Sequence, residues 1–94
     1  MIVQIDRMPL REFRRFIKFL ILEKDKRFKD GQIYDGDDKI AFVYSVKAGK
    51  EDNIMMEINT GFGSSRRLSK FEKREKAENI YRELYTKFKH GEIA

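Results

Sequence analysis

The chain has 94 residues, of which 40% are hydrophobic and 39% are charged, and its formal net charge is +5 at pH 7. A chain of this length builds one core, so we expect a single domain over residues 1–94. It contains no Cys and one His, which excludes disulfides, thiolate nucleophiles and the common zinc-binding clusters. We therefore expect a protein that is not an enzyme and that has no catalytic, metal or cofactor site.

Hydropathy and composition also indicate where the protein works. The longest apolar run, residues 19–22, is far too short to cross a membrane, and the first six residues lack the layout of a signal peptide. These features predict a cytoplasmic protein that does not bind membranes. Abundant Lys and Glu, beside three Asn and two Gln, are typical of proteins from thermophiles.

The charges are segregated along the chain. Residues 1–29 contain nine Lys or Arg against four Asp or Glu, and residues 61–94 contain nine against five. Between them, residues 30–60 contain three basic against seven acidic side chains. A surface that only maintains solubility mixes the two signs, whereas clustered basic charge is typical of nucleic-acid binding.

Residues 1–5 are apolar enough for a short strand, and Pro9 then marks the start of a helix. Apolar side chains recur at spacings of three and four residues, which predicts a helix of about four turns. This stripe comprises Leu10, Phe13, Ile17, Leu20 and Ile21. Phe16, Phe19 and Leu22 widen the apolar surface, which indicates either a deeply buried helix or a subunit contact. We expect these three residues at a subunit contact in a homo-oligomer.

The middle of the chain predicts a β-meander. Residues 24–30 form a charged segment that ends at Gly31, and this glycine is expected to end the first helix. The predicted strands are residues 32–34, 39–46 and 54–60, and the turn and the polar loop between them are residues 35–38 and 47–53. Two successive hairpins of this kind form an antiparallel sheet.

Ser69 and Glu72 form a capping box, which predicts that the last helix begins near Lys70. Its expected buried stripe is Ala77, Ile80, Tyr81, Leu84 and Phe88. The element order β-α-β-β-β-α predicts an α+β fold in which an antiparallel sheet has both helices packed on one face. The other face of the sheet is then open to water or to a partner.

Two basic segments are candidate sites for nucleic acid. In residues 61–70, two glycines, the pair Ser64 and Ser65 and two arginines precede a helix start, where backbone N–H groups favour anions. The site residues predicted there are Phe62, Ser65, Arg66, Arg67 and Lys70, with Phe62 stacking on a base. The alternative for this segment is an ordinary loop with solvated arginines.

The first helix supplies the second candidate site. Arg7, Arg11, Arg14 and Lys18 follow helical spacing, and with Arg15 they could contact a phosphate backbone. The alternative is a solvated outer face, which is the commoner fate of a run of charges. Tyr34, Tyr44 and Tyr85 are further rings that could reach the surface, and the sequence leaves open which sheet face Phe42 and Tyr44 occupy.

The acidic side chains Asp30, Asp35, Asp37 and Asp38 form a third cluster. Carboxylates at this density can hold Mg²⁺ or Ca²⁺, as in metal-dependent nucleases. Asp-Gly-Asp-Asp between two strands is, however, first a hairpin turn, so we assign no metal to it and expect it to repel nucleic acid.

The segment Gly61, Gly63, Ser65, Arg66, Arg67 and Lys70 resembles the Gly-rich basic motif that opens the second helix of double-stranded-RNA-binding domains. Lys73 and Arg74 depart from that motif, which has small core residues there. The α-β-β-β-α order of residues 9–89 also resembles the Alu-binding subunits of the signal recognition particle. Residues 13–19, the Lys/Glu-rich composition and the sheet meander resemble ThermoDBP-related proteins, which are oligomeric thermophile proteins that bind single-stranded DNA.

All three resemblances imply nucleic acid as the partner. We therefore predict non-enzymatic, largely sequence-independent nucleic-acid binding, with single-stranded DNA or RNA preferred over a duplex. A protein–protein interaction module with a basic surface is the alternative, and a metal-dependent nuclease is the third possibility.

Overall fold

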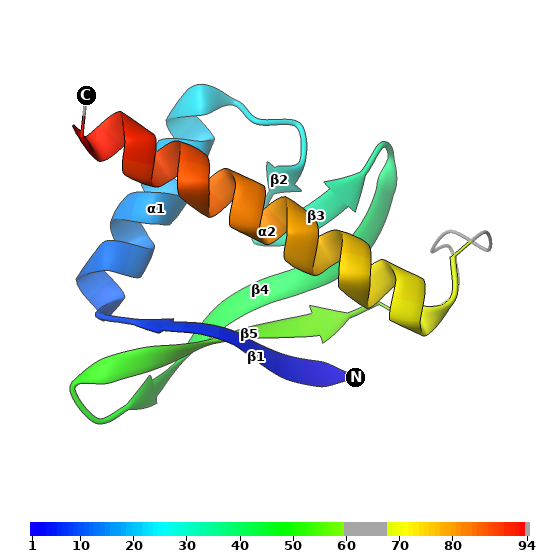
Figure 1. Ribbon diagram of the computed structural model, residues 1–94, viewed down its shortest axis with the longest axis horizontal. Coiled ribbons are helices and arrows are strands. Elements are labelled where there is room, and N and C mark those ends of the chain that lie inside the picture. The colour runs from blue at the N-terminus through cyan, green and yellow to red at the C-terminus, as the bar shows by residue number, and fades with distance from the viewer. Residues whose placement is uncertain (60–67, 94) are drawn as a thin grey trace.

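The computed structural model describes residues 1–59 and 68–93, which form an α+β fold (Figure 1). The elements are β1 (Ile2–Met8), α1 (Leu10–Glu23), β2 (Phe28–Lys29), β3 (Gln32–Asp35), β4 (Asp38–Ala48), β5 (Glu51–Ile58) and α2 (Lys70–Ile93). The strands form one five-stranded antiparallel sheet in the order β1-β5-β4-β3-β2. The predicted fold class is confirmed, with one strand more than expected.

The additional strand arises because α1 ends earlier than predicted, at Glu23 rather than near Gly31. Lys24 adopts a left-handed conformation with φ 54°, and its backbone N–H donates to the carbonyl of Ile21 at 3.2 Å. This cap ends the helix. Phe28 and Lys29, in the charged segment that we assigned to the helix, form β2. Asp30 and Gly31, with φ of 53° and 79°, make the tight turn into β3.

The hairpin of β4 and β5 is tighter than predicted. Pairing runs without a shift from Ala41 to Ala48, so that Gly49 and Lys50 alone separate the two strands, in place of the loop predicted over residues 47–53. Gly49 has φ 75°, the left-handed region that glycine adopts without strain. Because the register is continuous, successive residues of β4 lie on opposite faces of the sheet.

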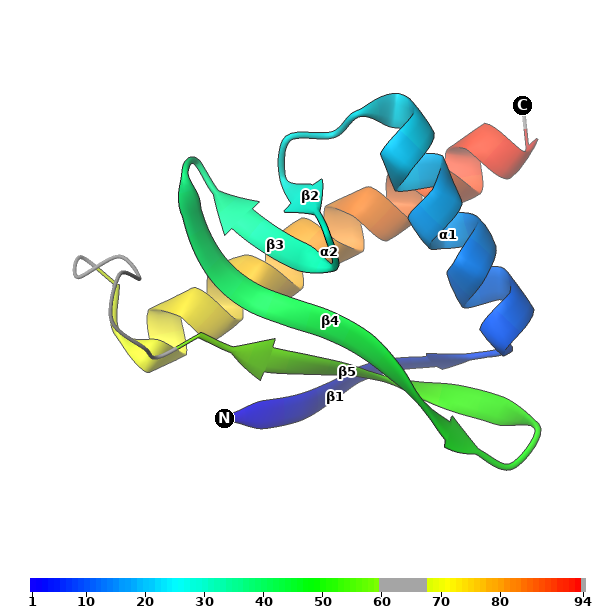
Figure 2. The same cartoon turned by 180° about the vertical axis from the view of Figure 1, so that it is seen from behind.

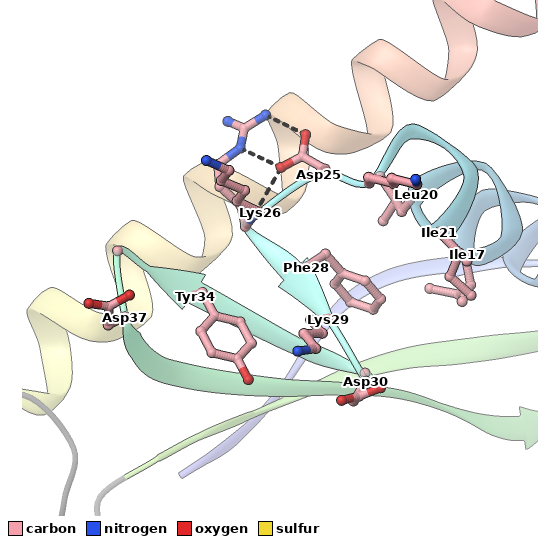
Figure 3. A pocket seen from close by; sticks show the side chains of 14 residues that line it. Ile17, Leu20, Ile21, Asp25, Lys26, Phe28, Lys29, Asp30, Tyr34 and Asp37 are labelled. Carbon is pink, nitrogen blue, oxygen red and sulfur yellow. Dashed lines mark hydrogen bonds and ion pairs between the residues drawn. The ribbon is translucent and has the colours of Figure 1, made fainter.

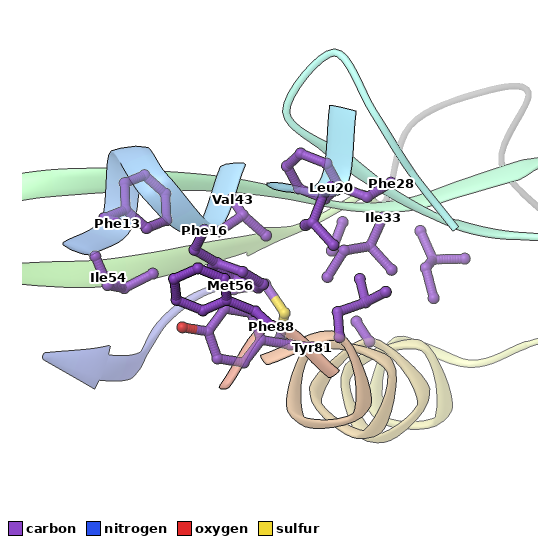
Figure 4. Packing of buried hydrophobic residues seen from close by; sticks show 14 of the residues in the cluster. Phe13, Phe16, Leu20, Phe28, Ile33, Val43, Ile54, Met56, Tyr81 and Phe88 are labelled. Carbon is purple, nitrogen blue, oxygen red and sulfur yellow. The ribbon is translucent and has the colours of Figure 1, made fainter. Parts of the chain in front are cut away.

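Both helices pack on the same face of the sheet, as predicted, and share one core (Figure 4). The buried residues of the helices are Phe13, Phe16, Leu20, Ala77, Tyr81, Leu84 and Phe88. Those of β3, β4 and β5 include Ile33, Ile40, Ala41, Val43, Ile54, Met56 and Ile58. The stripe predicted for α2 is therefore confirmed, with Ile80 only partly buried.

Most of the wide apolar surface of α1 packs against the core of the chain. Phe16 is 1% exposed, and the ring of Phe19 packs on Phe88 with 5.6 Å between ring centroids. The prediction that Phe16 lies at a subunit contact is therefore wrong, because the core of a single chain already holds its ring, whereas Phe19 is partly buried against the same core. A homo-oligomer stays a prediction. Leu22 and its neighbour Ile21 are the exposed apolar residues of this helix.

Polar contacts fix the helices in place. The Tyr81 hydroxyl donates to Asp6 at 2.9 Å, and the Tyr85 hydroxyl donates to Glu12 at 2.6 Å. Burial raises the pKa of Tyr81, as does the Asp6 carboxylate, and burial raises the pKa of Tyr85 to about 12. The hydrogen bonds from Tyr85 and then Lys89 lower the pKa of Glu12. These contacts tie β1 and α1 to α2.

Asp25 anchors the segment between α1 and β2. Its carboxylate accepts hydrogen bonds from the backbone N–H of Arg27 at 3.0 Å and from the guanidinium of Arg27 at 3.2 Å, and it lies 3.4 Å from Nζ of Lys87. Arg27 also donates to Glu83 at 2.6 Å. The Asp25 side chain is 7% exposed, and the hydrogen bonds from Arg27 lower its pKa to about 2. The ion pairs join this segment to α2.

Replacing Asp25 by Asn should lower the free energy of unfolding by about 1–2 kcal/mol at neutral pH, because charge-assisted hydrogen bonds are lost. The pKa of Asp25 falls from 3.8 to about 2 on folding, so its contribution is fully present above about pH 4 and is lost as the pH falls through about 2. Urea unfolding of both proteins across this range measures the difference. Asp37→Asn, in an exposed turn, is the control and should change stability by less than about 0.5 kcal/mol. A difference that persists below pH 2 would contradict the account.

Candidate nucleic-acid interface

Helix α1 carries four exposed cations, Arg11, Arg14, Arg15 and Lys18, as predicted. Arg15 lies 3.5 Å from Glu92 of α2. The other three form no ion pair with any residue in 1–59 or 68–93. Positions 11, 14 and 18 share one side of a helix, and we call Arg11, Arg14 and Lys18 the α1 ridge.

Arg7, which the sequence places in line with the α1 ridge, does not extend it. It lies in β1 and pairs with Glu51 of β5 at 3.4 Å. Because the helix begins at Leu10, helical spacing does not apply at position 7.

Helix α2 is also rich in charge, but most of its cations are engaged. Arg74 and Arg82 pair with Glu78 at 3.1 and 3.8 Å, and Lys76 reaches Asp35 at 2.9 Å. Arg82 and Arg74 thus pair with a carboxylate of the same helix, whereas Lys76 binds a carboxylate on another element. The solvent face of α2 is largely neutralised within the chain, and the α1 ridge is not.

One cation of α2 is buried rather than on the solvent face. Lys73 is 4% exposed and donates to the backbone carbonyl of Asn59 at 3.0 Å, so it joins α2 to the end of β5. The sequence predicted a capping box just before it, and this is confirmed. The N–H of Glu72 donates to the Ser69 hydroxyl at 3.2 Å, and the N–H of Ser69 donates to Glu72 at 3.1 Å.

A groove of about 520 Å³ runs between α1 and β4. We call it the α1 groove, and its lining residues are Leu10, Phe13, Arg14, Ile17, Lys18, Ile21 and Ser45. Its walls are apolar, its rim contains two members of the α1 ridge, and none of its lining residues is acidic. Such a groove suits a ligand that has both apolar and anionic parts.

The α1 groove continues at Ile17 and Ile21 into a larger pocket of about 890 Å³ beside β2 and β3 (Figure 3). Figure 3 shows Phe28 pointing toward Ile17 on the floor of this pocket, with Tyr34 and Lys29 nearer the sheet. Its basic residues include Lys24, Lys26 and Lys29, and its acidic residues are Asp25, Asp30 and Asp37. The pocket is therefore mixed in charge, unlike the α1 groove.

Phe42 and Tyr44 lie on the sheet face that the helices leave open. Their rings stack with centroids 5.4 Å apart and planes at 27°, and Phe42 is 38% exposed. Their neighbours Ala41 and Val43 point into the core, which answers the question that the sequence left open. We call Phe42 and Tyr44 the aromatic pair.

The aromatic pair is close to both hollows. A Cβ added to Gly31, which lines the larger pocket, would meet the Phe42 ring at 3.2 Å, so the absence of a side chain lets the ring lie on the backbone. Tyr44 immediately precedes Ser45, which lines the α1 groove. The aromatic pair and the α1 groove thus lie on opposite faces of one stretch of β4.

Of the site residues predicted in residues 61–70, Lys70 alone lies in the described part of the chain. Phe62, Ser65, Arg66 and Arg67 lie outside the described residues. Lys70 is the exposed first residue of α2, and Figure 1 shows this end of α2 far from α1. Helical rise places Lys70 about 20 Å from Tyr85, which packs on α1.

Of the other predicted rings, Tyr34 lines the larger pocket, whereas Tyr85 is held by Glu12. Gly36 and Asp37 form the turn between β3 and β4, as predicted for this acidic segment. Lys24, Lys26 and Lys29 were not among the predicted site residues, because the sequence assigned their segment to the end of a buried helix.

Within residues 1–59 and 68–93, no three His, Asp or Glu side chains are placed to hold a metal ion. No helix in this part of the chain is both long and apolar enough to cross a membrane. Comparisons with protein-family models, curated proteins and solved structures give no match to the chain. The cations, the groove and the rings are therefore the features that bear on function.

If the α1 ridge serves a ligand rather than the fold, its removal should leave stability intact. Changing Arg11 and Arg14 to Gln together should alter the free energy of unfolding by less than about 0.5 kcal/mol. Arg27→Gln, which breaks the contacts to Asp25 and Glu83, should lower it by about 1–2 kcal/mol. Urea denaturation of the variants compares them. Destabilisation by the double change as large as that by Arg27→Gln would show a structural role for the ridge.

Proposed function

We propose that the protein binds single-stranded nucleic acid without strong sequence preference. The α1 ridge would hold phosphates, and the aromatic pair would stack on bases. The observation that carries the proposal is that α1 presents three cations with no ion pair among the described residues, two of them on the groove that Ser45 of β4 lines, while two stacked rings lie on the other face of the same strand.

The spacing of the ridge suits a phosphate backbone. Arg11 and Lys18 are seven residues apart, which corresponds to about 10 Å along the helix. That length allows contacts to two or three successive phosphates of one strand. Arg14 lies between them and also lines the α1 groove, so it joins the phosphate contacts to the apolar surface.

The rings favour a single strand over a duplex. Bases stack on exposed aromatic side chains only when they are unpaired, and each such contact is worth about 1–3 kcal/mol. Stacking and phosphate contacts do not depend on base identity. Together, these two kinds of contact support binding that tolerates many sequences.

The phosphate contacts predict a steep dependence of affinity on salt. Fluorescence anisotropy with labelled oligo(dT) and oligo(U), over a series of salt concentrations, gives the log–log slope. Changing Arg11, Arg14 and Lys18 to Gln together should weaken binding and reduce the slope by about 2, since each contact to a single strand contributes about 0.7. Lys50→Gln, in the turn between β4 and β5, is the control for a lost charge and should change little. A wild-type protein that binds neither oligonucleotide at low salt would refute the proposal.

Stacking has a different signature. Phe42→Leu and Tyr44→Leu should each weaken oligonucleotide binding by about fivefold or more, with the salt slope unchanged, because stacking releases no counterions. Val46→Ala, on the same face of β4, removes no ring and should bind like the wild type. Equal affinities for all four proteins would remove the aromatic pair from the site and leave the ridge alone.

A further inference from the structure

Strand β4 pairs with β3 over its first half and with β5 from Ala41 onward. Strand β3 pairs with β4 from Asp38 to Phe42, whereas the pairing of β4 with β5 continues to Ala48. Figure 2 shows β4 extending beyond the short strands β2 and β3. Ser45, in this second half of β4, lines the α1 groove together with residues of α1. Over residues 44–48, therefore, one edge of β4 is not paired with any strand of the described chain.

The backbone groups on this edge can be identified. The N–H of Val43 donates to the Gly31 carbonyl at 2.8 Å, so residue 43 directs its backbone groups toward the β3 side. Alternate residues of a strand direct these groups to the same side. The N–H and C=O groups of Ser45 and Lys47 therefore point away from β5, toward the α1 groove. An open edge of this kind is a template for another strand.

The groove beside the edge can accept side chains. Ser45 faces Phe13, Ile17 and Ile21 across about 520 Å³, which is room for a few residues of extended chain. Ile21 is 66% exposed, so an apolar side chain placed there would remove its surface from water.

The charges around the unpaired edge of β4 indicate which kind of partner it binds. Arg14 and Lys18 lie on the rim, and Lys47 lies on β4 itself, and none of them has an ion pair among the described residues. A second copy of the chain would bring the same cations against them. An extended segment with carboxylates would instead neutralise them.

We propose that the second half of β4 accepts an extended acidic segment of a partner protein as a sixth strand. The segment would hydrogen-bond to the backbone of Ser45 and Lys47, with apolar side chains against Ile17 and carboxylates toward Arg14 and Lys18. This activity goes beyond the proposed function. Because the two ligands share Arg14 and Lys18, the acidic segment and the nucleic acid exclude each other.

A labelled peptide of alternating Val and Glu tests the inference with the full chain. We expect saturable binding in fluorescence anisotropy, weakened by salt, and displacement of bound oligonucleotide by unlabelled peptide. Ser45→Pro removes one edge N–H and blocks strand addition, so it should reduce peptide affinity at least tenfold, whereas Ser45→Ala should not. Phe42→Leu, whose ring lies on the opposite face of β4, should instead weaken oligonucleotide binding and keep the affinity for the peptide. This result separates the two activities.

Amide hydrogen exchange of the wild type keeps the test valid even if Ser45→Pro does not fold. The N–H groups of Ser45 and Lys47 should exchange rapidly in the free protein and at least tenfold more slowly with the peptide bound. No peptide binding, or binding that leaves both amides unprotected, would overturn the inference. Protection by the oligonucleotide but not by the peptide would assign the groove to nucleic acid and also overturn it. Peptide binding without oligonucleotide binding would refute only the proposed function.

Discussion

The ring of Phe16 lies edge-on to Tyr81 and Tyr85, with centroids 5.6 and 5.3 Å apart, and it is almost fully buried. Aromatic pairs in this geometry stabilise a core beyond the area that they bury. The contact fixes α1 against the C-terminal half of α2 and sets the rotation of α1 about its axis. With Phe13 and Phe16 inward, helical geometry directs the α1 ridge outward. The exposure of the cations therefore follows from the packing of one ring.

The same packing leaves part of β4 uncovered. Helix α1 crosses from the end of β1 to the start of β2, the two edge strands, and β2 and β3 are too short to follow β4 along its whole length. Ser45 thus borders an apolar groove, while the aromatic pair lies on the opposite face of the same strand. Charge, rings and an open backbone edge meet at residues 42–47. No other surface of the described chain combines all three.

Local signals in the sequence were sufficient to predict where both helices begin. Pro9 and the periodic apolar residues predicted the start of α1, and Ser69 and Glu72 predicted that of α2, because capping depends on neighbouring residues only. The end of α1 was not predictable in this way, since Lys24 caps the helix without being Gly or Asn.

The faces of the sheet required tertiary information. The register shift between Ile33 and Tyr34 changes the alternation at the start of β4, so that adjacent Ile40 and Ala41 are both fully buried. Sequence alternation alone therefore did not reveal that Phe42 is exposed. The sequence alone likewise did not show which apolar residues of α1 face the core of the chain. Phe19 was predicted to lie at a subunit contact, yet its ring packs against Phe88, which is distant in the sequence.

The central claim is that the α1 ridge and β4 form one ligand-binding surface. Titration of ¹⁵N-labelled protein with a short oligo(dT), followed by two-dimensional NMR, tests it most directly, because every backbone amide reports separately. The account predicts that the largest shift changes fall on residues 10–18 and 42–47, and that the solvent face of α2 around Arg82 changes little. The largest changes on that face of α2, with residues 42–47 unaffected, would contradict it.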